Sequence, residues 1–208
     1  HARDDKGRTI LHYAAKDTRL DLVLQMSKLP DVNVQDNDGQ TALHVAAKSH
    51  HVVMVTALLE KSADPNRQDK NGDTALHLAN MDIVALLVNA PNIDVNIQND
   101  KNMTVLQKCV AVSTFMHLET VKLLLDHGAD PDVRTLQNET LFMKAIKDDN
   151  MELVKTLIDK GADPNVRWKG TCALMMAVQK QEYRNNNGDP PLLAAQKAKK
   201  ALDILELL

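Results

Sequence analysis

Thr41-Ala-Leu-His-Val-Ala-Ala47 indicates the fold of this chain, because similar heptads recur along its length. The copies begin at Thr9, Thr74, Thr104, Thr140 and Cys172, and the copies at Thr9 and Thr74 keep the Leu-His pair. Successive copies start 32, 33, 30, 36 and 32 residues apart. Self-similarity at one period of roughly 20–50 residues is typical of arrays in which each repeat buries its apolar face on its neighbours.

A second motif keeps the same period. An Asp lies two residues before an Asn or Asp in five places, at Asp31-Val-Asn33, Asp64-Pro-Asn66, Asp94-Val-Asn96, Asp130-Pro-Asp132 and Asp163-Pro-Asn165. Paired acid–base catalysis does not need five copies of one motif. We therefore expect these carboxylates to brace loops.

Each repeat can be interpreted as a hairpin followed by two helices. Thr41 stands where a helix N-cap belongs, and His44, three residues later, is placed to hydrogen-bond back toward that cap. The run Val52–Leu59 has apolar residues at helical spacing and predicts the second helix. Gly128 and Gly161 suit the left-handed residue that ends a helix, and Asn37-Asp-Gly39 suits a hairpin tip.

The combined pattern resembles that of the ankyrin-repeat family. It consists of Asp36-x-x-Gly39-x-Thr41-x-Leu43-His44-x-Ala46-Ala47, then Leu58-Leu59, then Ala63-Asp64-x-Asn66. The resemblance covers nearly the whole chain and implies an all-α ankyrin-repeat solenoid of stacked helix-turn-helix units with short β-hairpin fingers. It implies one domain, 1–208, with about six units near 4–36, 37–69, 70–99, 100–135, 136–167 and 168–208. It also implies a concave face of fingers and inner helices that binds proteins without catalysis.

Three repeats depart from the period. In the third repeat the span Thr74–Ile83 is five residues shorter than the matching span Thr41–Val55. This difference is more than one helical turn. We expect a stacked repeat hardly to tolerate this loss, and so predict that residues are missing between Asn80 and Met81. The fourth repeat is longer, with an enlarged loop near 113–117, and the sixth carries a polar loop, 184–191, before a predicted helix, 192–208. The chain has no initiator Met and ends on Leu207-Leu208, so we expect a fragment of a longer protein.

Composition excludes several classes of function. Lys and Arg number 25 against 28 Asp and Glu, a net charge of −3, so there is no strongly basic surface for nucleic acid. No apolar run is long enough for membrane insertion. Cys109 and Cys172 lack the spacing of a zinc site or a disulfide framework, which favours a cytoplasmic, reducing location. Capping explains the repeated His slot better than metal binding does, and no nucleotide-binding, hydrolase or metalloprotease motif is present. We expect no metal, no cofactor and no enzyme activity.

Side chains at positions that do not follow the repeat pattern are candidates for contact with a protein or peptide partner. They lie on the later fingers and inner helices, and the set is Met103, Leu136, Glu139, Met143, Lys144, Asp148, Trp168 and Lys169. Trp168 is the only Trp and is placed at a hairpin tip, where it serves either as an interface anchor or as packing against the fifth repeat or the sixth repeat's long loop.

The first interpretation is therefore a non-catalytic recognition module. The alternative is a targeting or autoregulatory segment of a larger enzyme, channel or pathogen effector, with an intramolecular domain as its partner. A third class, capture of a small molecule or oligonucleotide, is disfavoured by the nearly balanced charge.

Overall fold

The computed structural model describes residues 2–25, 31–111, 118–134, 139–148, 150–163, 165, 167–168 and 171–172. The chain divides into two compact parts, His1–Gly128 and Ala129–Leu208. The N-terminal part contains α1 (Ile10–Lys16), α2 (Leu20–Gln25), α3 (Ala42–Lys48), α4 (Val52–Glu60), α5 (Ala75–Leu78), α6 (Met81–Leu87), α7 (Val105–Ala111) and α8 (Leu118–Asp126). The C-terminal part contains α9 (Leu141–Lys147), α10 (Met151–Asp159), β1 (Arg167–Trp168) and β2 (Thr171–Cys172).

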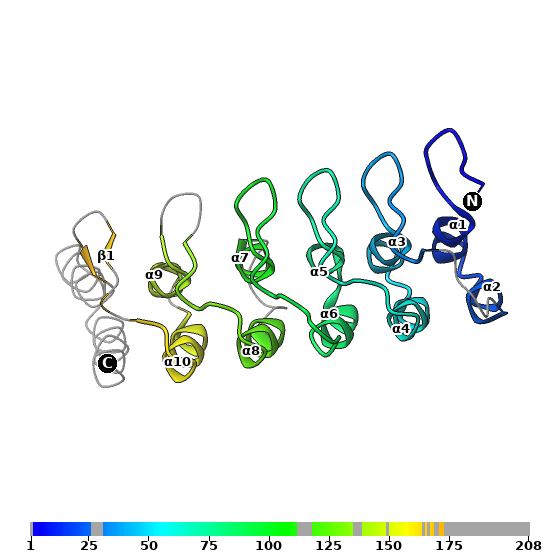
Figure 1. Ribbon diagram of the computed structural model, residues 1–208. Coiled ribbons are helices and arrows are strands. Elements are labelled where there is room, and N and C mark those ends of the chain that lie inside the picture. Colours follow the sequence, from blue (N-terminus) through cyan, green and yellow to red (C-terminus); the bar gives the residue numbers. More distant parts are fainter. Residues whose placement is uncertain are drawn as a thin grey trace, which may run out of the picture. The chain divides into compact units, whose positions relative to one another are not determined.

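The helices of the N-terminal part form two rows (Figure 1). The first helix of each repeat lies directly below a hairpin loop and contacts the first helix of the next repeat, in the order α1, α3, α5, α7. The second helices contact one another in the order α2, α4, α6, α8. We call the first helices inner helices, the second helices outer helices, and the hairpin loops fingers.

The C-terminal part repeats the same plan on a smaller scale. Helices α9 and α10 pack on each other. The short antiparallel pair β1–β2 follows, with Arg167 opposite Cys172 and Trp168 opposite Thr171. An isolated antiparallel bridge joins Arg134 to Thr140, just before α9.

Small and branched apolar side chains build the core. In the second repeat Leu43, Ala46 and Ala47 of α3 and Val55 and Leu58 of α4 are fully buried or nearly so. Burial of one Leu side chain stabilises a fold by about 1.5–3 kcal/mol. Alanines on the inner helix let the neighbouring helix approach closely, so the repeat pattern is in large part a packing pattern.

The predicted helix stops are confirmed. Gly128 and Gly161 both have φ of 84°, the left-handed region in which glycine has no steric penalty. Ser62 and Asn92, which follow α4 and α6, take up the same region with φ of 62° and 60°.

The short third repeat is accommodated by ending its inner helix early. Helix α5 has four residues where α3 has seven, and Ala79 leaves it in an extended conformation with ψ of 147°. The Asn80 side chain then accepts a hydrogen bond from the Ile83 backbone N–H, 3.1 Å away, and caps α6. The expectation that a stack hardly tolerates this shortening is therefore wrong. Asn80 ends the short connection after α5, and its side chain caps α6 directly. The prediction that residues of the natural chain are missing between Asn80 and Met81 is not tested and stays a prediction.

Three other features lie outside the described residues. They are the enlarged loop near 113–117, the polar loop 184–191 and the helix expected over 192–208. The six repeat boundaries likewise stay predictions.

Candidate functional site

Each finger of the N-terminal part is a tight turn organised by the side chain that opens it. In the second repeat the Asp36 carboxylate accepts hydrogen bonds from the backbone N–H groups of Asp38 and Gln40, both at 2.9 Å. Asp69 does the same for Asn71 and Asp73 in the third repeat. Such side-chain-to-backbone bonds fix a loop conformation before any ligand arrives.

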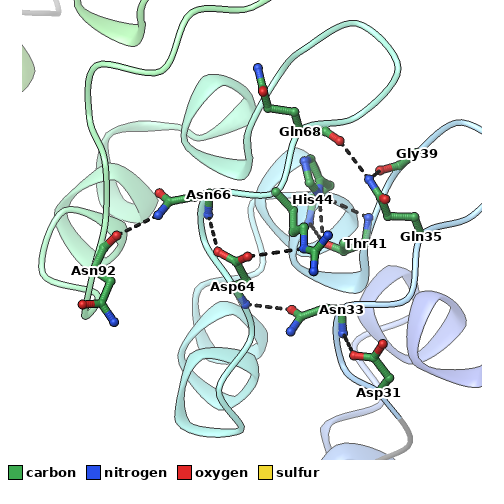
Figure 2. Close-up of polar contacts among 11 residues, drawn as sticks. Asp31, Asn33, Gln35, Gly39, Thr41, His44, Asp64, Asn66, Gln68 and Asn92 are labelled. Carbon is green, nitrogen blue, oxygen red and sulfur yellow. Dashed lines mark hydrogen bonds and ion pairs between the residues drawn. The ribbon is translucent and has the colours of Figure 1, made fainter.

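Hydrogen bonds also join each finger to the next. The backbone N–H of Asn37 donates to the Lys6 oxygen at 2.8 Å, and that of Lys70 donates to the Asp38 oxygen at 3.0 Å. The Gln35 amide donates both to its own finger, at the Gly39 oxygen, and to the following finger, at the Gln68 oxygen (Figure 2). The fingers of the N-terminal part are thus a connected row.

A column of buried histidines joins the inner helices to the fingers. His44 Nδ1 lies 3.2 Å from the Thr41 backbone nitrogen, and His44 Nε2 lies 3.0 Å from the Asp73 backbone oxygen (Figure 2 shows the capping pair). A carbonyl only accepts hydrogen bonds, so Nε2 carries the proton and Nδ1 accepts from the Thr41 N–H. His12 and His77 repeat this arrangement. The predicted structural role of the three histidines is confirmed.

Burial favours the neutral form of two of these three imidazoles. It lowers the pKa of His44 and of His77, although hydrogen bonds to backbone carbonyls and nearby aspartates act in the opposite direction.

A second column consists of asparagines in the loops that follow the outer helices. Asn33 accepts from the Asp64 backbone N–H at 2.7 Å, and Asn66 accepts from that of Asp94 at 2.9 Å. Asn66 also donates to the Asn92 oxygen (Figure 2). Within each loop the preceding aspartate accepts from the asparagine's own N–H, as Asp64 does at 3.0 Å. The aspartates therefore brace loops, as predicted.

The inner helices leave a variable row of side chains on the surface. The residue four positions after the cap threonine is Tyr13, Val45, Leu78 or Lys108 in successive repeats of the N-terminal part. Tyr13 is exposed and the other three are half-buried. This row changes from aromatic to aliphatic to cationic while the buried positions around it stay nearly constant.

Comparison with known proteins shows the family to which these repeats belong. The family model for ankyrin repeats matches in three overlapping copies, over residues 11–99, 58–135 and 106–185. The chain belongs to the ankyrin-repeat family. A comparison with curated proteins gives no match. The predicted fold class, an all-α ankyrin-repeat solenoid, is confirmed, and ankyrin repeats generally mediate protein–protein interactions.

Only some of the predicted partner-binding residues of this ankyrin array lie on its described surface. Lys144 and Asp148 form an ion pair on α9 at 3.0 Å, and their side chains are 33% and 55% exposed. Glu139 is largely buried and pairs with Lys147. Met103 is half-buried in the N-terminal part, and its backbone oxygen accepts a hydrogen bond from His77 Nε2.

The prediction that Met143 contacts a partner is wrong. Its side chain is fully buried, so it offers nothing to a partner in this structure. The reason is its slot: Met143 stands three residues after Thr140, where His44 stands after Thr41, and its backbone N–H donates to the Thr140 hydroxyl. The slot faces the core whatever residue occupies it.

Three predicted residues are described in part or not at all. Trp168 lies in β1, opposite Thr171, but its side chain is outside the described part of the chain. Leu136 and Lys169 lie outside it entirely. The two roles considered for Trp168 both stay predictions.

The described residues offer neither a metal site nor a membrane-spanning helix. That part of the chain holds no group of three or more His, Cys, Asp or Glu side chains suited to a metal ion. None of its helices has the length and apolar character needed to cross a bilayer. Cys109 is a free thiol whose pKa burial raises to about 11, which makes it a poor nucleophile at neutral pH.

One cavity lies between the inner and outer helices of the third and fourth repeats. Its volume is about 150 Å³ and its lining is mainly apolar. Residues from α5 to α8 contribute, among them Ala79, Asn80, Met81, Cys109 and Thr120. Sequence reasoning missed this feature, although the shortened third repeat marked its position.

Proposed function

We propose that the array is a non-catalytic protein-interaction module that binds a segment of a partner on its finger and inner-helix face. The observation that carries the proposal is the double anchoring of this face. The buried histidines and the finger-to-finger bonds hold its backbone, whereas the variable inner-helix row differs from repeat to repeat. In that row Tyr13 is exposed, and Val45, Leu78 and Lys108 are half-buried. A face that is already ordered loses little conformational entropy on binding.

In the C-terminal part the proposed contacts are the side chains that ignore the repeat pattern. On α9 Lys144 is half-buried and Asp148 is exposed, and Trp168 follows in β1. Trp is among the residues that contribute most to interface energies. Leu136, Glu139 and Lys169 stay proposed contacts of this part, Met103 stays a proposed contact of the N-terminal part, and Met143 is omitted.

The test is a matched pair of charge reversals on the two helices of one repeat. A random peptide library displayed on phage is selected on the full array, and the affinity of a selected peptide is measured by calorimetry. Lys144→Glu on inner helix α9 should weaken binding, whereas Lys155→Glu on outer helix α10, where Lys155 is exposed, should not. Trp168→Ala should lower affinity by about 2 kcal/mol if Trp168 is an anchor. Equal losses for Lys144→Glu and Lys155→Glu would contradict the proposed face.

A targeting or autoregulatory role within a larger protein is the second candidate, and a cytoplasmic location suits both. The same face would then hold an intramolecular domain of an enzyme, channel or effector. Competition distinguishes the two: a peptide selected on the isolated array would fail to bind the full-length protein if a neighbouring domain occupied the face.

A further inference from the structure

The cavity beside α5 exists because the third repeat lacks the last turn of its inner helix. In the second repeat Ala46 and Ala47 lie inside α3 and are fully buried. Their counterparts, Ala79 and Asn80, lie beyond the end of α5 and are half-buried. Helix α7 of the next repeat therefore faces space that a turn of α5 would otherwise occupy.

The walls of the cavity suit an apolar group. The Cys109 thiol is protonated at neutral pH, since burial raises its pKa to about 11, and it behaves as a small apolar surface. Met81 also lines the cavity, and its flexible side chain is 50% exposed. A cavity of about 150 Å³ has room for one aromatic ring or one branched aliphatic side chain.

Two polar groups on the cavity wall can orient an incoming segment. The buried Thr120 hydroxyl oxygen has no hydrogen-bond partner in the described part of the chain. Lys108 Nζ donates to the His77 backbone oxygen at 2.6 Å, and among the described residues no carboxylate pairs with this ammonium group. An incoming segment with a carboxylate beside its apolar side chain would complement the charge of Lys108.

We propose that this cavity receives one apolar side chain of the partner segment, and that an Asp or Glu adjacent to it in the segment faces Lys108. The inference rests on the proposed function and adds to it a position and a chemistry. Lys108 lines the cavity and also belongs to the variable inner-helix row, so a segment lying along that row comes next to the cavity wall.

The first arm of the test uses fluorobenzene as the probe. The methyl resonance of Met81, labelled with ¹³C, should shift saturably as fluorobenzene is added to the full array. A variant that copies residues 48–52 between Asn80 and Met81 restores the missing turn and should abolish the shift. Cys109→Leu, which enlarges one wall residue, is the second variant in case the insertion does not fold. Absence of a saturable shift in the parent array would overturn the proposal.

The second arm uses peptides selected on the array by phage display. Peptides that displace fluorobenzene, carry an acidic residue next to an apolar one, and lose about tenfold or more in affinity with the insertion variant would support the proposal. Peptides that bind without displacing fluorobenzene would overturn the cavity site and leave the module function intact. Failure to select any peptide that binds the array would count against both.

Discussion

His44 Nε2 donates a hydrogen bond to the backbone oxygen of Asp73, 29 residues later and in the next repeat, at 3.0 Å. The opposite nitrogen of the same ring caps the helix that carries it. One imidazole therefore sets both where an inner helix begins and how the following finger is held. His12 and His77 repeat the arrangement, which makes the binding face and the stack depend on the same bonds.

Replacing His44 should destabilise the array according to how much of this bonding is lost. We expect His44→Ala to cost about 2–3 kcal/mol, because it leaves buried backbone groups without partners. His44→Gln should cost less, since Gln107 fills this slot in the fourth repeat and accepts from the Thr104 N–H at 2.6 Å. Urea unfolding followed by circular dichroism measures both changes, and an equal loss in the two variants would refute the capping role.

Acid should weaken the array through the same residues. The pKa values of His44 and His77 lie below the ordinary 6.5 because of burial, so the unfolded chain takes up protons that the native chain does not. The free energy of unfolding should therefore fall as the pH falls below 6.5, by at most about 1.4 kcal/mol per histidine per pH unit. Urea titrations at several pH values test this. In the double variant His44→Gln/His77→Gln the free energy of unfolding should depend less steeply on pH. An unchanged slope would mean that groups other than these two histidines cause the pH dependence.

Two glycines with positive φ should respond differently to alanine. A Cβ at Gly72 would lie 2.6 Å from the Asp100 backbone nitrogen in the next finger, whereas a Cβ at Gly128 would meet nothing within 4 Å. Gly128→Ala should cost only the left-handed strain, about 1–2 kcal/mol. Gly72→Ala should cost more, because the two fingers must also separate. Thermal melts of the two variants provide the comparison, and equal destabilisation would argue against close contact between fingers.

Much of the fold could be predicted from the sequence because the period reveals the local chemistry. The Thr41 cap, the Gly128 helix end and the aspartate-braced loops are all determined by near neighbours in the chain. The bond from His44 to the next finger, and the bond from Asn33 to Asp64, join residues about one period apart. A repeated motif shows that such residues recur but does not show which atoms meet.

The candidate site was harder to predict for a related reason. Met143 departs from the repeat pattern in identity but not in position, and its burial follows from the position. The shortened third repeat was visible in the sequence, yet the chain closes over it through Asn80 and leaves a cavity. Variation alone therefore does not identify surface. The side chain must vary at a slot that the stack leaves open.

Asp132 offers a gain in stability. It accepts from the Asp163 N–H at 3.0 Å, in the role that neutral Asn33 and Asn66 fill in earlier repeats, and burial raises its pKa. Stability linked to this carboxyl falls as the pH rises through and above 3.8, because the native form holds the proton more tightly. We expect Asp132→Asn to add about 0.5–1 kcal/mol at neutral pH. The gain should vanish near pH 3. Urea titrations at the two pH values would show it, and a gain of equal size at both would exclude ionisation as its cause.

Hydrogen–deuterium exchange of the array with and without a selected peptide locates the face that binds the peptide. We expect the bound peptide to slow exchange in the fingers and in inner helices α3, α5 and α7, with little change in outer helices α4 and α6. Slowed exchange confined to the outer helices, with fingers and inner helices unchanged, would contradict recognition through the finger and inner-helix face.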